Sequence, residues 1–239
     1  MDKKIGAKSR SSSLPSVFIA VFLLLVWIAI GLAQEGEVDV RALVQETQKW
    51  SGKQGEVTLI WWVPEEYWRV SIAQGGNVTV AQVEEVIKVL RPYIVIVVVD
   101  GKVGSFGGIT YTPEPTIRAT LQIRDSEGVR YHPLDEDTIS PDSKNFLLMI
   151  KPLFANLVGQ LGQNMQIFLF PAENKKGQKI AEAKKEGTFS VELDEREFKW
   201  RLPLGSLLIP KICPVCGEKL SGAYKFCPWD GTKLSETKK

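Results

Sequence analysis

The sequence contains very little histidine and cysteine: among 239 residues there are one His and three Cys. The single histidine, His132, stands in a loop-like segment, and Gly104–Gly107 (GSFG) lacks the residue between Gly and Ser that a nucleophile elbow requires. The glycine-rich segment 100–108 matches neither of the common phosphate-binding patterns. The twelve-residue calcium loop with its central glycine is also missing. The central part of the chain is therefore without a motif that encodes catalysis.

Net charge is also scarce, and most of it lies at the N-terminus. The chain has 30 Lys and Arg against 28 Asp and Glu, a formal net charge of +2. Residues 1–33 contain four basic residues and one acidic residue, whereas the remainder contains 26 basic and 27 acidic residues. A nucleic-acid-binding domain is therefore not expected. The hydrophobic share of 44% and the charged share of 24% exclude a disordered chain, a collagen and a polytopic membrane protein.

Residues 17–33 form a long apolar run of seventeen residues without a charge, VFIAVFLLLVWIAIGLA. Its length fits the core of a signal peptide cleaved after Ala33, where Gly31 and Ala33 supply the small residues, and it also fits an uncleaved signal anchor. Basic residues precede the run and acidic residues follow it, so both readings place the rest of the chain across the membrane. An anchored chain would lie in the periplasm or at the cell surface, and a chain cleaved after Ala33 would be secreted. The absence of a cysteine near position 33 excludes a lipid-modified lipoprotein.

The sequence divides into three segments. Residues 1–33 are predicted to be the signal peptide or signal-anchor helix, residues 34–205 an α+β domain with a mixed sheet and about three helices, and residues 206–239 a small tail. Strands and helices do not alternate strictly, which argues against a doubly wound parallel sheet. The leucines and prolines of Arg201–Lys211 predict an extended segment that is docked on the domain, so the tail should lie close to it.

The strongest local signal within the domain is Tyr93–Val99, whose nearly continuous β-branched residues are typical of a central strand buried on both faces. A helix is expected between Thr79, a suitable N-cap, and Pro92, which stops it. Another helix is expected to begin at Ser140 and to kink at Pro152. The other predicted elements are a helix within Val38–Trp50 and strands at Val57–Val63, Ile117–Ile123, Gln166–Phe170 and Thr188–Leu193.

Four tryptophans, Trp61, Trp62, Trp68 and Trp200, allow two interpretations. They could form an aromatic face that binds a ligand, or they could pack against one another in the core. We favour the core, because that is the usual role of large aromatic side chains.

The acidic cluster of the domain consists of Asp135, Glu136, Asp137 and Asp142. We interpret it as a solvated loop rather than a calcium site. A pair of catalytic carboxylates stays open as an alternative, since such pairs meet in space rather than in sequence. An enzyme of this kind would use His132 or the carboxylates of residues 135–142, and it would bring His132 and Asp137 into one cleft.

The most specific pattern lies at the C-terminus, where two similar segments each contain a cysteine, a proline and a glycine. Cys213–Gly217 (CPVCG) is followed after ten residues, counted from Cys216, by Cys227–Gly231 (CPWDG). Each segment is expected to form a tight turn whose backbone N–H groups point at the ligands, with glycine supplying the required φ. The thiolate-rich tetrahedral set favours Zn²⁺, and a carboxylate oxygen can serve as the fourth ligand. The predicted metal ligands are Cys213, Cys216, Cys227 and Asp230.

The pattern C-P-x-C-G…F-C-P-x-D-G-T-x-L resembles the zinc-ribbon tails that are attached to many bacterial proteins. The resemblance is confined to the tail, and it implies a small fold with a structural zinc ion but no particular activity; Asp230 is its departure from the four-cysteine form. Two alternatives stay open: a disulfide from Cys213 or Cys216 to Cys227, and a metal-free ribbon held by hairpin packing. More generally, the domain resembles exported or membrane-anchored bacterial proteins of unknown function.

As function, the sequence predicts a non-enzymatic interaction or assembly protein of the cell envelope. Its partners would be the membrane, through residues 17–33 if they are not cleaved, and a protein at the envelope, with no nucleic acid. The alternatives are an envelope hydrolase or transferase and a thiol-redox role for Cys213 and Cys216. An interaction protein should expose an apolar patch, which would distinguish it from the enzyme.

Overall fold

The computed structural model describes residues 38–51, 53–74 and 78–235. Over these ranges the chain is α+β, as predicted, but it has five α-helices rather than about three. The strand pairings within them are antiparallel, so the sheets are not mixed. The predicted signal or anchor helix at residues 17–33 lies outside the described residues. Within the residues that are described, no helix is long and apolar enough to span a membrane.

The larger sheet contains five strands and is built around β3 (Tyr93–Val103). As predicted, β3 is central: it pairs with β2 (Glu56–Val63) on one edge and with both β7 (Gln166–Pro171) and β4 (Ile109–Tyr111) on the other. β1 (Gln48–Trp50) completes the sheet beside β2. Two helices join β2 to β3 and return the chain to the end of the sheet that it left, which makes the pair antiparallel.

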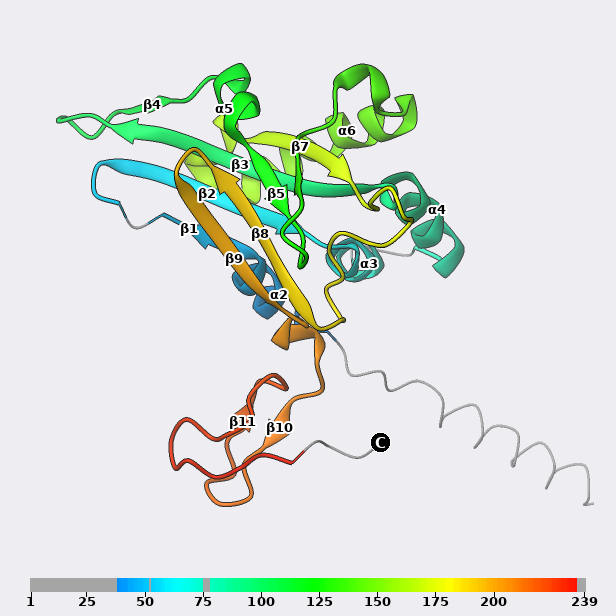
Figure 1. The fold of residues 1–239 in the computed structure, drawn as a ribbon, viewed down its shortest axis with the longest axis vertical. Helices are drawn as coiled ribbons and strands as arrows, with labels where there is room; N and C mark the ends of the chain where they lie inside the picture. The colour runs from blue at the N-terminus through cyan, green and yellow to red at the C-terminus, as the bar shows by residue number, and fades with distance from the viewer. Residues whose placement is uncertain (1–37, 52, 75–77, 236–239) are drawn as a thin grey trace, which may run out of the picture. The chain divides into compact units, whose positions relative to one another are not determined.

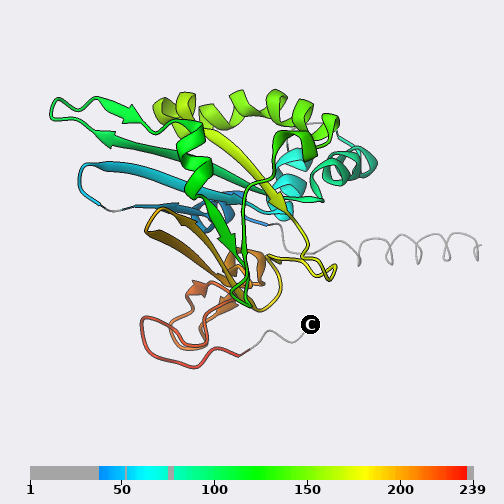
Figure 2. The ribbon, with the colours of Figure 1, turned by 45° about the horizontal axis from the view of Figure 1, so that its top comes forward.

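Both faces of the larger sheet are covered, and two neighbouring tryptophans of β2 show how. The ring of Trp61 packs on Tyr67 and Phe154, which belong to the helical layer. The ring of Trp62 packs on the opposite side against Phe189 and Trp200 of the smaller sheet. Figure 2 shows the helix that contains Phe154, α6 (Pro141–Val158), along one side of the sheet and the hairpin of β8 (Gly187–Leu193) and β9 (Arg196–Leu202) along the other. The alternation of side chains along a strand thus places one tryptophan in each half of the core.

Two smaller sheets complete the β structure. The first has the order β6 (Arg130–Tyr131), β5 (Gln122–Arg124), β8 (Gly187–Leu193) and β9 (Arg196–Leu202), and its hairpin β8–β9 lies in front of β1 and β2 in Figure 1. The second, in the tail, pairs β10 (Lys211–Ile212) with β11 (Lys219–Leu220).

The helices begin where the sequence supplies N-terminal caps. Thr79 and Gln82 form the reciprocal capping box of the predicted helix that ends at Leu90, and Ser140 accepts a hydrogen bond from the backbone N–H of Ser143 at the start of the longest helix. The α-helices are α2 (Val40–Thr47), α3 (Glu65–Gln74), α4 (Val80–Leu90), α5 (Glu114–Thr120) and α6 (Pro141–Val158); short 3₁₀ helices are η1 (Glu136–Thr138), η2 (Gly159–Asn164) and η3 (Gly205–Leu207).

One predicted strand is in part a helix. Ile117–Ile123 divides into the end of α5 and the start of β5. Pro113 occupies the N-cap position of α5 and Pro115 lies in its first turn, where proline is favoured. The alternation misled because buried Ile117 and Leu121 also satisfy the helical spacing of four residues.

A second predicted element is shorter than expected. The helix placed within Val38–Trp50 ends at Thr47, and Gln48–Trp50 continues as β1. Pairing with Leu59–Trp61 of β2 captures these residues in the sheet, a long-range contact that no local pattern encodes.

The tryptophans lie in the core, as favoured from the sequence. Trp61, Trp62, Trp68 and Trp200 are all at least 95% buried. Two of the indole N–H groups form hydrogen bonds with α2: Trp61 donates to Thr47 Oγ1 at 3.1 Å, and Trp200 donates to the carbonyl of Glu46 at 3.1 Å. These bonds fasten the end of α2 to both halves of the core.

A buried charge links the two sheets of the domain. The Asp100 carboxylate on β3 accepts hydrogen bonds from the hydroxyls of Thr58 and Thr112, both at 2.7 Å, and pairs with Arg196 Nη1 of β9 at 2.8 Å. Burial acts to raise the pKa of Asp100, but these three donors outweigh it and hold the pKa below its ordinary value. The carboxylate is therefore ionised at neutral pH, and Arg196 is its only cationic donor among the described contacts.

We expect Arg196→Met to lower the free energy of unfolding by about 3 kcal/mol, because it leaves a buried carboxylate without its cation. Lys199→Met on the same strand is the control, since its pair with Glu197 is exposed and worth less than about 1 kcal/mol. Urea unfolding at neutral pH measures both variants. Because the folded-state pKa of Asp100 is lowered, the advantage of the wild type is present above the ordinary carboxyl pKa and should shrink in acid. Equal losses in the two variants would contradict the link.

Candidate metal centre

The two cysteine-containing segments of the tail form matching turns. The backbone N–H of Gly217 donates to the carbonyl of Cys213, and that of Gly231 donates to the carbonyl of Cys227, both at 3.0 Å. The two glycines have φ angles of +74° and +73°, a region that residues with a Cβ rarely adopt. The predicted turn geometry is therefore confirmed, and it explains the glycine that follows each ligand pair.

The turns bring the four predicted ligands together. One ligand atom from each of Cys213, Cys216, Cys227 and Asp230 lies within 4.8 Å of all the others. Cys216 Sγ and Cys227 Sγ are 3.7 Å apart, and Cys213 Sγ is 3.3 Å from Asp230 Oδ2. In a tetrahedral site with metal–sulfur bonds of about 2.3 Å and a metal–oxygen bond of about 2.0 Å, these separations would be about 3.8 and 3.5 Å. The cluster therefore has the dimensions of a tetrahedral metal site.

The fourth ligand is held in place by its own turn. Asp230 Oδ1 accepts a hydrogen bond from the backbone N–H of Thr232 at 2.8 Å, which leaves Oδ2 directed at Cys213. Such an outer hydrogen bond fixes the orientation of a ligating carboxylate. Asp230 can therefore take the position of the cysteine that stands here in the four-cysteine pattern.

The neighbouring ligands alter one another's pKa values. Hydrogen bonds from Thr232 lower the pKa of Asp230. Burial acts to raise the pKa of Cys213, but backbone N–H donors of its own turn outweigh this and lower it. For Cys216, a hydrogen bond from the backbone of Glu218 opposes the shift, yet desolvation and the neighbouring ligands raise its pKa to about 12. The cluster alone therefore retains protons that a bound divalent cation would displace.

The tail has almost no apolar core of its own. Its buried cluster contains only four residues, Cys213, Leu220, Cys227 and Leu234. All three cysteines are free thiols, so no disulfide ties the two turns together in this structure. A segment with so little buried apolar surface needs a metal or a covalent link to be stable.

Glu46 at the end of α2 fastens the junction between domain and tail. Its carboxylate accepts hydrogen bonds from the backbone N–H of Gly205 at 2.7 Å and from both the N–H and the hydroxyl of Ser206, at 2.8 and 2.6 Å. The preceding Leu204 is fully buried, and its N–H donates to the carbonyl of Ala183 at 2.7 Å. The expected docking of the connecting segment is thus found at residues 204–206, whereas its partner Glu46 carried no signal in the sequence.

The residues considered for catalysis lie on the surface of the domain. His132 is exposed, and so are Asp135, Glu136, Asp137 and Asp142. None of them lines the pocket beside Trp62 or the pocket beside Asp125. Neither of these two pockets therefore brings His132 and Asp137 together.

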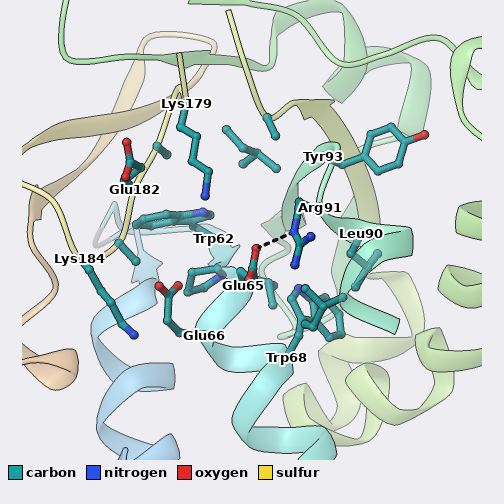
Figure 3. Close-up of a pocket in the computed structure, with 17 residues that line it drawn as sticks. Trp62, Glu65, Glu66, Trp68, Leu90, Arg91, Tyr93, Lys179, Glu182 and Lys184 are labelled. Carbon is teal, nitrogen blue, oxygen red and sulfur yellow. Dashed lines mark ion pairs between the residues drawn. The ribbon is translucent and has the colours of Figure 1, made fainter. Parts of the chain in front are cut away.

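A cavity of about 280 Å³ that sequence reasoning did not anticipate lies where β2 leads into α3 (Figure 3). Trp62, Trp68 and Leu90 supply apolar walls, while Glu65 pairs with Arg91 at 3.8 Å across it. Its lining includes no Ser, Thr, Cys, His or Asp. Carboxylates and amines are present instead, from Glu65, Glu66, Glu182, Lys179 and Lys184, and Arg91 pairs with the first of these.

The outer face of α6 is a second feature that the sequence did not reveal. Ile150 and Phe154 are buried against the domain, but four large apolar side chains on the other side of the helix are 62–69% exposed: Leu148, Met149, Leu153 and Leu157. Met149, Leu153 and Leu157 are spaced by four residues and so share one stripe. Soluble monomers rarely expose such a contiguous set, and one that does usually contacts another molecule there.

Comparison with known proteins adds no assignment: no family model, no curated protein and no solved structure matches the chain significantly. The metal centre therefore stands on its own residues and geometry.

The geometry predicts that the purified protein binds about one equivalent of a divalent metal ion through its tail. Cys227→Ser should release the metal, because it removes a buried ligand. Glu218→Gln is the matched control, since its side chain is exposed and it contributes only its backbone to the first turn. Elemental analysis with a thiol count measures the outcome. A protein without metal and with three reactive thiols would contradict the site.

Proposed function

We propose that this protein is a non-enzymatic interaction or assembly protein of the bacterial cell envelope, whose tail is held together by a structural zinc ion. Residues 17–33 would direct it there as a signal anchor or a cleaved signal peptide. The observation that carries the interaction role is the exposed apolar face of α6, because it is the kind of patch that distinguishes a binding protein from an enzyme.

Zinc is the metal that the ligand set supports best. Three thiolates and one carboxylate at tetrahedral separations suit Zn²⁺, whereas Mg²⁺ and Ca²⁺ prefer six or more oxygens. All four positions are supplied by the protein, so the ion would have no open position for a substrate or water. A structural role follows from this closure, and it also argues against redox use of Cys213 and Cys216, whose thiolates would be ligands.

The enzyme alternative has less support. The exposed His132 and the carboxylates of residues 135–142 line neither pocket, and the lining of the pocket beside Trp62 includes no Ser, Thr, Cys or His. The interaction role is supported by two features of the domain: its large buried core and the exposed apolar face of α6.

Fractionation of bacterial cells tests the proposed location. The full chain should stay with the membranes in alkaline carbonate, or appear in the periplasm shortened to Gln34 if the peptide is cleaved, whereas a chain that starts at Gln34 should remain in the cytoplasm. Protease added to spheroplasts should degrade the domain of the full chain. A full chain that stays in the soluble cytoplasm would contradict the proposal.

In-cell photo-crosslinking tests the partner surface. A photoreactive residue at Leu153 should give a discrete adduct with another protein, because this side chain lies in the exposed stripe of α6. The matched control is Val80, which is 87% exposed on α4 and lies outside the stripe. Gel electrophoresis and mass spectrometry detect the adducts. No adduct at Leu153, or equal adducts at both positions, would contradict the proposal.

A further inference from the structure

The two metal-binding turns share surface residues as well as ligands. Aligned on their first cysteines, residues 212–219 read ICPVCGEK and residues 226–233 read FCPWDGTK. Both place an apolar residue before the cysteine, a second apolar residue inside the turn and a lysine at the end. Metal binding requires the cysteines, the carboxylate and the glycines, but nothing in the ligand chemistry requires apolar residues or lysines at these positions.

The apolar residues of the repeat face solvent. The exposed fractions are 70% for Ile212, 71% for Val215, 58% for Phe226 and 76% for Trp229, and we call these four side chains the knuckle face. Val215 directly precedes the ligand Cys216, and Trp229 directly precedes the ligand Asp230. The two side chains therefore flank the metal position, one from each turn. The fold of the tail does not bury any of the four, which leaves their matching placement in the two turns without an internal role.

Lysines border the knuckle face. Ile212 pairs across the β10–β11 hairpin with Lys219, and Phe226 is bridged to Lys233 in the second turn. Both lysines are exposed, as is Lys225. Between residues 206 and 235 the only acidic residues are Glu218 and the ligand Asp230. The face therefore combines aromatic and aliphatic side chains with a basic border, although the whole chain is almost neutral.

The tail leaves the domain close to the point where the described chain begins. Glu46, at the end of α2, holds Gly205 and Ser206, from which the tail continues, and α2 lies beside this segment in Figure 1. Only residues 34–37 separate the apolar run from Val38. An extended chain spans at most about 3.6 Å per residue, so an anchor in a bilayer would keep this end of the domain within roughly 20 Å of it.

We infer that the knuckle face binds the surface of a bilayer that contains anionic phospholipid. The four apolar side chains enter the headgroup region, and the bordering lysines contact lipid phosphates. Trp and Phe beside lysines that can extend toward the headgroups are typical of the membrane interface, whereas lysine is depleted from protein–protein interfaces. The inference rests on the proposed function in one respect, that residues 17–33 bring the chain to a membrane.

Vesicle co-sedimentation tests the inference with the zinc-loaded chain from Gln34 to Lys239, which lacks the apolar run; Val38–Lys239 forms a compact unit of its own. The probes are vesicles of phosphatidylcholine alone and of phosphatidylcholine with an equal amount of phosphatidylglycerol. The chain should bind the anionic vesicles more tightly. Val215→Ser and Trp229→Ser should each weaken binding about tenfold, because each removes a large inserted side chain. Lys219→Gln with Lys233→Gln should remove the preference for anionic vesicles.

Two exposed apolar residues outside the tail serve as matched controls. Phe106→Ser at the tip of the β3–β4 hairpin and Val80→Ser on α4 should leave vesicle binding unchanged. A zinc content equal to that of the wild type shows that each tail variant is folded. The inference is overturned if the wild type binds neither vesicle, if Trp229→Ser binds as the wild type does, or if a control loses binding equally.

Two further results distinguish a lipid-binding face from a protein-binding one. A photoreactive residue at Trp229 that captures a protein in cells, while Trp229→Ser leaves vesicle binding intact, would show that the face binds protein and would overturn the inference. If the full chain proves cytoplasmic but the chain from Gln34 still binds anionic vesicles through Trp229, the proposed function fails and the lipid-binding face stands.

Discussion

The burial of β2 and β3 on both faces is the constraint on which the rest of the domain depends. A strand pair that is apolar on both sides must be covered twice, and here α3, α4 and α6 cover one face while the β8–β9 sheet covers the other. Trp61 and Trp62 divide the core between these layers. The buried pair of Asp100 with Arg196 then ties the two sheets together at one end. Because this core is large, α6 can leave four apolar side chains in solvent without loss of the fold.

The tail is stabilised in a different way from the domain. Its described part buries only four apolar side chains, too few to offset the entropy of ordering about thirty residues, so it needs a bound ion or a covalent link to be stable. Glu46 connects the tail to the domain. Its carboxylate accepts hydrogen bonds from Gly205 and Ser206 at the start of the tail. Its backbone carbonyl accepts a hydrogen bond from the indole N–H of Trp200 in the core.

Much of this could be predicted from the sequence wherever the cause is local. The β-branched run of β3, the Thr79 cap of α4 and the Ser140 cap of α6 each carry their own signal, and the spacing of Cys213, Cys216, Cys227 and Asp230 encodes their meeting. The predictions that failed depend on distant partners or on a local pattern that fits two structures. Gln48–Trp50 became a strand because β2 was beside it, and Ile117 and Leu121 fit two periods at once. Three further features arise only when separate segments meet, so no motif could have indicated them. They are the cavity lined by Trp62, the hydrogen bonds of Glu46 to the start of the tail and the exposed side of α6.

The central claim, that Cys213, Cys216, Cys227 and Asp230 hold one structural zinc ion, is tested most directly by X-ray absorption at the zinc edge of the purified full chain. The account predicts a four-coordinate shell with three sulfur atoms at about 2.3 Å and one oxygen at about 2.0 Å. A shell without sulfur, or with waters in place of protein ligands, would contradict it.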